Sequence, residues 1–149
     1  MKRFTVAVVI VVSASVAALV GAPARGGTST EVLRIYDPTG QVKTELTISD
    51  IVRSSALADR SIGGVPALVF ALTKSGQGKL HVLTRGLARR GARLHRNQVF
   101  AIAIDGHVYS TPFIDYKVEP DGIPAGGSGM EMNVSSFALA KKLAFELRG

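Results

Sequence analysis

The chain has 149 residues, with 18 Lys and Arg against 11 Asp and Glu, a formal net charge of +7, and no Cys or Trp. This length allows one small domain, and the lack of Cys excludes disulfide frameworks, thiolate zinc sites, cysteine nucleophiles and lipid attachment at a cysteine. With 46% hydrophobic residues, the composition is typical of a globular protein that is stabilised by packing alone.

The first 24 residues have the layout of a secretory signal peptide. Lys2 and Arg3 precede an uncharged stretch from Phe4 to Val20, and Ala22-Pro23-Ala24 places small residues at both positions that a signal peptidase reads. Cleavage after Ala24 is predicted, with an uncleaved membrane anchor as the alternative, because the uncharged stretch is at the lower limit for spanning a bilayer. Both alternatives predict an exported domain that is secreted, periplasmic or at the cell surface.

Residues 25–64 are predicted to hold a flexible lead and an N-terminal β-hairpin. Val32–Tyr36 and Val42–Ile48 are β-prone, and the Pro and Gly of Asp37-Pro38-Thr39-Gly40 between them favour a turn. The pattern from Ser49 to Gly64 is weak. We predict a short helix there, capped by Ser49 or Asp50 and ended by Gly63-Gly64.

A buried strand and a long amphipathic helix follow. Val65–Leu72 is an apolar run too short for a free-standing helix, and it predicts a buried strand. Within Gly76–Leu94, four leucines share a narrow arc at helical spacing, which predicts an amphipathic helix: Leu80, Leu83, Leu87 and Leu94. Gly86 and Gly91 each cost about 1 kcal/mol relative to Ala inside a helix, unless a closely packed neighbour needs the space.

The strongest local pattern is a β-hairpin centred on Asp105-Gly106. This dipeptide tolerates the positive φ angles of a type I′ turn between the strands Val99–Ile104 and His107–Thr111. A two-residue loop fixes the register. The expected pairs are Ile104 with His107, Ala103 with Val108, Ile102 with Tyr109, and Ala101 with Ser110. Pro112 cannot donate to a sheet ladder, so the second strand lies at an edge or bends there.

One face of this hairpin is a broad apolar surface that carries Phe100, Ile102, Ile104 and Tyr109. The surface is core if the N-terminal hairpin or another chain covers it, and a binding patch if it is exposed. We favour core. The edge from Val108 to Ile114 is open to a peptide that adds a strand to the sheet, a mode that reads backbone and suits unfolded polypeptides.

The C-terminal part is predicted to contain a mobile loop, a strand and a helix. Lys117–Gly129 is rich in Pro and Gly, which oppose helix and sheet. Met130–Val134 predicts a last strand, and Phe137–Arg148 a helix with Ser135 or Ser136 as N-cap and Gly149 as its terminating residue. The predicted buried stripe of this helix is Ala140, Leu143, Ala144 and Leu147.

These elements predict an α+β domain with a small mixed or antiparallel sheet and two helices packed on one face. The series resembles the head of the first periplasmic domain of the SecD and SecDF family, and this resemblance implies a fold related to ferredoxin-like folds. The resemblance covers Val65 to Gly149, 85 of 149 residues. Its centre is the hairpin Ala101-Ile102-Ala103-Ile104-Asp105-Gly106-His107-Val108-Tyr109-Ser110-Thr111-Pro112.

Further family positions match on both sides of this hairpin. Upstream they are Phe70, Thr73, Gly78, Lys79, Leu83 and Thr84; downstream they are Gly126-Gly127-Ser128, Leu139-Ala140, Leu143-Ala144 and Leu147-Arg148-Gly149. Two departures stand out. The family's usual Asn-Phe-Thr before the last helix reads Asn133-Val134-Ser135, and its multi-span membrane region has no counterpart in these residues. The resemblance implies a fold and an affinity for polypeptide near the Sec translocon, and it assigns Asp105, Gly106, Val108, Ser110 and Pro112 as structural motif residues.

Candidate partner-binding residues lie in three segments: Arg85, Arg89 and Arg93 with the nearby Lys74 and Arg96, Tyr109 in the hairpin, and Gly126-Gly127 in the loop. Between Lys74 and Arg96 there are seven Lys and Arg and no Asp or Glu. A solvated outer face is the plainer interpretation of this charge run. The alternatives are anionic lipid headgroups, an acidic partner or anionic envelope polymers, while no motif supports nucleic acid.

No catalytic, metal or cofactor site is predicted. His81, His95 and His107 lack metal-ligand spacing. Ser110 has no Gly-x-Ser-x-Gly elbow around it, and Gly126-Gly127-Ser128-Gly129 lacks the Lys-Ser or Lys-Thr ending of a phosphate loop. Asp105 is interpreted as a turn residue, because its side chain suits the turn geometry.

Three hypotheses follow. The favoured one is an exported, non-enzymatic interaction module that binds unfolded polypeptide, Sec translocon components or another envelope partner. The second is a surface or wall-associated protein that binds polyanions through its basic helix. The third is a hydrolase, which would need two titratable groups converging in a pocket.

Overall fold

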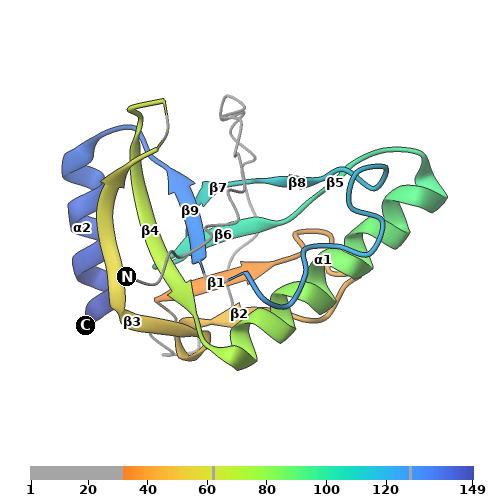
Figure 1. Ribbon diagram of the computed structural model, residues 1–149, viewed down its shortest axis with the longest axis horizontal. Helices are drawn as coiled ribbons and strands as arrows, with labels where there is room; N and C mark the ends of the chain where they lie inside the picture. Colours follow the sequence, from red (N-terminus) through yellow and green to blue (C-terminus); the bar gives the residue numbers. More distant parts are fainter. Residues whose placement is uncertain (1–31, 62, 128) are drawn as a thin grey trace.

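The computed structural model describes residues 32–61, 63–127 and 129–149, so the predicted signal peptide lies outside the described residues. In chain order (Figure 1), the elements are β1 (Leu33–Tyr36), β2 (Leu46–Thr47), the 3-10 helix η1 (Ile48–Asp50), β3 (Ile51–Arg60), β4 (Pro66–Leu72), α1 (Lys74–Leu94), β5 (Gln98–Val99), β6 (Ala101–Ile104), β7 (His107–Ser110), β8 (Phe113–Ile114), β9 (Gly129–Asn133) and α2 (Phe137–Arg148). The α+β class with two helices is confirmed.

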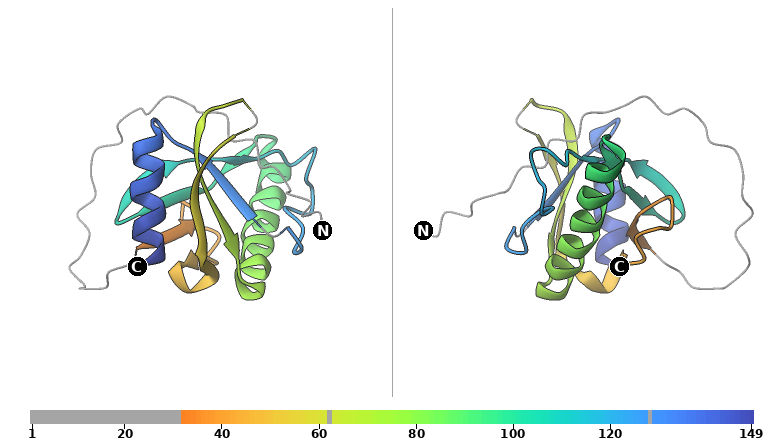
Figure 2. Two further views of the ribbon diagram at one scale, coloured as in Figure 1. Left: turned by 60° about the vertical axis from the view of Figure 1, so that its left-hand side comes forward. Right: turned by 90° about the vertical axis from the view of Figure 1, so that its right-hand side faces the viewer.

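The described strands form three antiparallel sheets rather than a single one. Their orders are β2-β1-β6-β7, β3-β4-β9 and β5-β8. Helix α2 packs on β3 and β4, whereas α1 contacts η1, β5 and β8. In Figure 1 and in the left view of Figure 2, the β3–β4 ribbon is seen between α2 and α1. Helix α1 also contacts β2 and β4, so both helices reach β4.

The N-terminal hairpin is present, and the segment after it differs from the prediction. β1 pairs with a shorter β2, and β1 also pairs with β6. The short helix predicted after Ser49 is wrong: only the three residues of η1 are helical, and a ten-residue strand, β3, follows. β3 pairs with β4, but a register shift between Val52 and Leu57 interrupts the pairing. This irregularity hides the two-residue alternation that identifies a strand in sequence.

The central hairpin has the predicted turn, with a bulge beyond it. Asp105 and Gly106 have φ angles of 48° and 78°, as a type I′ turn requires. The pairs Ile104–His107 and Ala103–Val108 are confirmed, but Ile102 lies opposite Ser110. The pairs predicted for Tyr109 and Ala101 are therefore wrong, because one extra residue of β7 is accommodated there.

The apolar face of the hairpin belongs to the core. Phe100, Ile102 and Ile104 are fully buried, and the half-buried Tyr109 packs against them. The hairpin continues past Pro112, because the Phe100 amide donates to the Pro112 carbonyl at 3.0 Å and β8 pairs with β5. β7 lies at the edge of its sheet, as Pro112 predicted. The preference for core over a binding patch is confirmed.

Helix α1 buries Leu80, Leu83 and Leu87, but Leu94 is 46% exposed. Leu94 is the last residue of the helix, because His95 turns into the left-handed region with φ 51°. Leu94 therefore leaves the predicted buried stripe, and Arg96 no longer follows the helical arc. Both interior glycines face close neighbours: a Cβ on Gly86 would lie 3.0 Å from the Val42 side chain, and one on Gly91 would lie 2.9 Å from the Arg96 carbonyl oxygen.

The connection between β8 and β9 has no regular element, as predicted, but it is anchored on α1. The Ile123 amide donates to Thr84 Oγ1 at 2.9 Å, and the Ile123 carbonyl lies 2.9 Å from His81 Nδ1. A Cβ on Gly122 would lie 2.3 Å from the Arg85 amide nitrogen. The prediction of a mobile loop is therefore wrong at Gly122-Ile123.

Helix α2 matches its prediction at both ends and along its buried face. Ser136 is the N-cap and accepts a hydrogen bond from the Leu139 amide, and Gly149 ends the helix with φ 85°. Its buried residues are Ala140, Leu143, Ala144 and Leu147. Within residues 32–61, 63–127 and 129–149, neither helix combines the length and the apolar character that a bilayer crossing needs.

Candidate functional site

β7 forms one edge of the four-stranded sheet. Its inner side pairs with β6, and no other described strand pairs with its outer side. In a two-residue hairpin the pair next to the turn is hydrogen-bonded and the following pair is not, so the Val108 amide and carbonyl point away from β6. The Val108 side chain is 50% exposed. Val108 therefore offers one outward donor and one outward acceptor.

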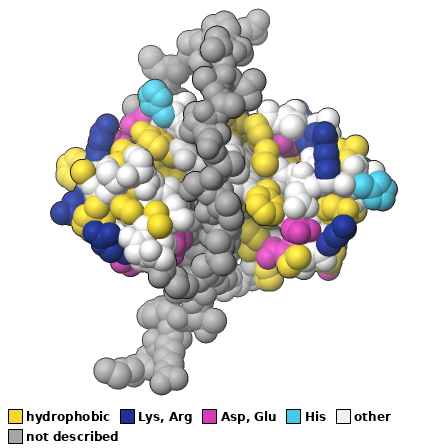
Figure 3. Space-filling view, turned by 90° about the horizontal axis from the view of Figure 1, so that it is seen from above, with side chains coloured by type: hydrophobic (Ala, Val, Ile, Leu, Met, Phe, Trp, Pro, Cys, Tyr) yellow, Lys and Arg dark blue, Asp and Glu magenta, His cyan; other side chains and the backbone are white. Residues whose placement is uncertain are grey.

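The other strand edges are less suited to accept a strand. β2, β5 and β8 have only two residues each, and β9 carries Glu131. β3 carries Arg53, Asp59 and Arg60 as well as a register shift. Charged residues and irregularities of this kind protect edges against added strands. β7 has no Asp, Glu, Lys or Arg. Seen from above, the described surface carries hydrophobic side chains interspersed with Lys and Arg (Figure 3).

The candidate residues predicted from sequence fall in separate places. Arg85, Arg89 and Arg93 are exposed on α1, Tyr109 is half-buried on β7, and Gly126 is exposed in a turn of the β8–β9 loop with Gly127 after it. Among the described residues, no hydrogen bond or ion pair joins these three groups. They make distinct surfaces, not one site.

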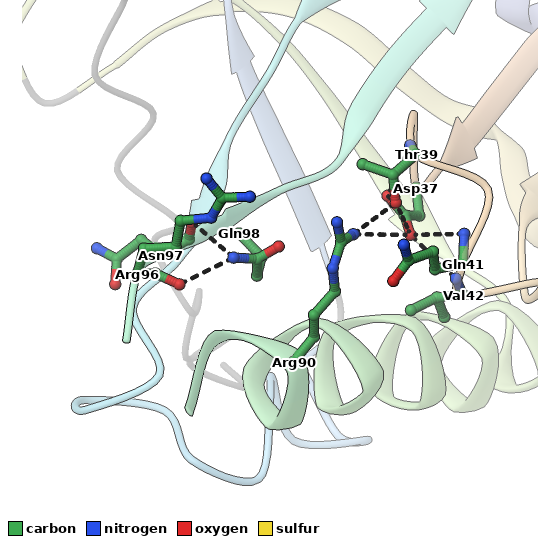
Figure 4. A network of polar contacts seen from close by, with 8 residues as sticks. All are labelled: Asp37, Thr39, Gln41, Val42, Arg90, Arg96, Asn97 and Gln98. Atoms are coloured by element: carbon green, nitrogen blue, oxygen red, sulfur yellow. Dashed lines mark hydrogen bonds and ion pairs between the residues drawn. The ribbon is translucent and has the colours of Figure 1, made fainter. Parts of the chain in front are cut away.

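A buried polar cluster joins α1 to the turn after β1, and the sequence did not reveal it (Figure 4). The Asp37 side chain is fully buried and accepts hydrogen bonds from the amides of Thr39 and Val42 at 2.9 and 3.0 Å. Arg90 Nη1 lies 3.6 Å from Asp37 Oδ2 and donates to Thr39 Oγ1. In the sequence, Asp37-Pro38-Thr39-Gly40 predicts only a turn. Arg90 is 53 positions further along the chain, and only the fold brings it next to Asp37.

The Asp37 carboxylate is stabilised in its charged form. Burial alone raises the pKa of this carboxyl, but hydrogen bonds from the Val42 and Thr39 amides and the Thr39 hydroxyl, with the positive charge of Arg90, outweigh it. The pKa of Asp37 therefore lies below its usual value of about 3.8. The Gln41 amide also donates to Asp37, at 3.2 Å, so the carboxylate has four donors and an ion pair. The cluster therefore fixes the turn after β1 against α1.

The lowered pKa of Asp37 predicts acid-sensitive stability. A carboxyl with a lower pKa in the folded state contributes stability above the unfolded pKa, near 3.9, and that contribution is lost as the pH falls through the folded-state pKa. We expect the difference in unfolding free energy between the wild type and Asp37→Asn, measured in urea, to be constant from pH 7 to 5 and to shrink below pH 4. A difference that stays constant down to pH 2.5 would contradict this assignment.

The histidines occupy unrelated positions. His81 bonds to the Ile123 carbonyl, His95 ends α1, and His107 begins β7 at the surface. In the part of the chain that the structure describes, no group of three or more His, Asp or Glu side chains is placed to hold a metal ion.

Two solved structures are similar to the fold of this chain. A crystal structure of SecDF in the super-membrane-facing form matches with TM-score 0.54 and 27% identity over 69% of this chain and 12% of that one. A structure of the membrane component SecDF that enhances protein export matches with TM-score 0.50 and 25% identity over 69% of this chain and 40% of that one. This chain has a SecD-like fold.

The SecD-like chain corresponds to a minor part of the SecDF chains, 12% and 40% of their lengths. No family model and no curated protein matches it. In the SecD-like domain, the motif residues Asp105 and Gly106 form the turn, Val108 and Ser110 lie on β7, and the Pro112 carbonyl accepts from the Phe100 amide just before β8. The motif therefore specifies the geometry of the β7 edge.

Proposed function

We propose that this SecD-like domain is an exported, non-enzymatic interaction module that contacts translocating or unfolded polypeptide beside components of the Sec machinery. The observation that carries the proposal is the structural likeness to SecDF, a membrane component that enhances protein export. The likeness extends over 69% of the chain, and its sequence motif lies in the hairpin that ends in an open strand edge.

The β7 edge suits an unfolded client. A peptide that adds to a sheet edge is bound by its backbone, which every sequence shares. The outward amide and carbonyl of Val108 supply the hydrogen bonds, and its half-exposed side chain supplies apolar contact. Binding of this kind is weak and tolerant of sequence, which fits a contact that must let a moving chain pass.

Val108→Pro tests this edge. Proline removes the outward amide of residue 108 but takes no hydrogen bond from the β6 ladder, because Val108 and Ala103 form the non-hydrogen-bonded pair. We expect Val108→Pro to lower crosslinking of the domain to a secretory polypeptide arrested in the translocon by at least fivefold. The matched control is Val108→Thr, which keeps the amide and the β-branched shape and should crosslink as the wild type does.

Circular dichroism of both variants separates loss of the edge from loss of the fold. If folded Val108→Pro crosslinks as strongly as Val108→Thr, the β7 edge is not the contact. If the wild-type domain crosslinks to neither secretory polypeptide nor Sec components in the native envelope, the proposed function itself is wrong.

A further inference from the structure

Helix α1 presents a row of cations on its outer face. Lys74, Arg85, Arg89 and Arg93 are all exposed, and at 100° per residue they fall within an arc of about 100°. With a rise of 1.5 Å per residue, the row is about 28 Å long. Val82 is the one large apolar residue between them, and it is 53% exposed. The row is long and one side chain wide.

The fold neutralises the other cations of α1 and leaves this row without carboxylate partners. Lys79 Nζ lies 2.8 Å from Asp50 Oδ2, and Arg90 is paired with the buried Asp37. The remaining ion pairs of the described residues, Arg34–Glu45 and Lys142–Glu146, lie outside α1. No member of the row forms an ion pair with any described residue.

The carboxylates of the neighbouring β8–β9 loop do not pair with the cations of this row either. The loop that holds Asp115, Glu119 and Asp121 is fixed against α1, because Gly122 rests on the backbone of Thr84 and Arg85. None of these three carboxylates lies within ion-pair distance of the row. The arginines therefore keep their donors available for an external anion, and α1 itself has no Asp or Glu to weaken the field.

The geometry points to a linear phosphate-bearing polymer as the ligand, and we propose that the face Lys74–Arg85–Arg89–Arg93 binds such a chain. A guanidinium matches phosphate oxygens with two parallel hydrogen bonds. Arg85, Arg89 and Arg93 recur every four residues, about 6 Å apart along the helix axis, and so meet successive anions of an extended chain. A helix that lies on a membrane presents large apolar residues beside its cations, whereas Leu80, Leu83 and Leu87 are buried in the core.

This inference goes beyond the proposed function, because it uses a different surface and a different class of ligand. The mature chain from residue 25 contains every helix and strand that the structure describes, with the complete described core, and it serves as the test protein. The probe is poly(glycerol phosphate). Each cation that meets a phosphate of a single-stranded chain contributes about −0.7 to the slope of log K against log salt, so four cations predict a slope of about −3.

Replacing Arg85, Arg89 and Arg93 together by Gln should reduce the salt slope to about −0.7 and weaken binding at least 30-fold at low salt. Replacing any one of them should lower the magnitude of the slope by about 0.7. The matched control replaces three exposed cations outside α1, Lys43, Arg53 and Lys141, by Gln. It changes the net charge equally and should keep the slope near −3.

Two outcomes would overturn the proposal. In one, the control variant loses as much affinity as the α1 variant, which would mean that net charge alone attracts the polymer. In the other, vesicles with anionic phosphatidylglycerol bind the chain through the same arginines while the polymer does not, which would assign the face to a membrane surface. Val108→Pro should leave polymer binding unchanged, so failure here is distinguishable from failure at the β7 edge.

Discussion

Replacing Gly76 by Ala should destabilise the protein by about 3 kcal/mol, although Ala is the better helix former. A Cβ at Gly76 would lie 2.2 Å from the carbonyl oxygen of Asp50. That oxygen belongs to backbone, and it accepts hydrogen bonds from the Thr73 amide at 2.9 Å and the Thr73 hydroxyl at 3.2 Å. The first turn of α1 can therefore accept a methyl group only by leaving η1. The free energy of unfolding in urea measures the loss.

Gly78→Ala is the matched control, two residues further along the same helix. A Cβ there would meet nothing within 4 Å. The exchange should then show only the helix preference, a gain of about 1 kcal/mol. We therefore expect the free energy of unfolding to fall for Gly76→Ala and to rise for Gly78→Ala. A gain at both positions would show that α1 and η1 do not meet as described.

Replacing Asp37 by Ala should destabilise the protein by about 3 to 5 kcal/mol, because it leaves a buried charge without its partner. The Arg90 side chain is only 10% exposed, and its Nε has no hydrogen-bond partner even in the intact cluster. The same change removes the acceptor of three backbone amides, those of Thr39, Gln41 and Val42. The midpoint and slope of urea unfolding at pH 7 provide the measurement.

Adding Arg90→Met to Asp37→Ala should recover about 2 kcal/mol of the loss, since an apolar chain of similar length replaces the stranded charge. Non-additivity of this sign identifies the pair as coupled. Additive effects of the two single changes would mean that Asp37 acts only through the turn amides and that Arg90 contributes through packing alone.

Sequence predicted the elements whose signals are local. The Asp105-Gly106 turn, the N-cap Ser136 and the terminating Gly149 depend on a few neighbouring residues, and all occur as predicted. Features that depend on distant partners were missed. β3 is a strand because β4 pairs with it across a register shift, and Arg90 is buried because Asp37 reaches it from another segment. The register shift at Tyr109 was also missed, because the rules for a two-residue hairpin do not include an extra residue in one strand.

For the basic face of α1, too, the sequence predicts some features and misses others. The basic periodicity of Arg85, Arg89 and Arg93 could be seen in the sequence, and their exposure follows from the leucines on the opposite side of the helix. What the sequence could not show is which cations of α1 find carboxylates. Arg90 lies beside Arg89 in the chain, yet one is buried in an ion pair and the other is open to solvent.

The order of strand pairing has a consequence for how the molecule acquires its shape. β1 near the start pairs with β6 from the middle, and β4 pairs with β9 close to the end. Helix α2, the last element, covers β3 and β4. During synthesis, β1 therefore lacks its second partner until β6 is made, and β4 lacks its second partner until β9 is made. The C-terminal residues therefore complete the core, because α2 contributes Leu143, Ala144 and Leu147 to it.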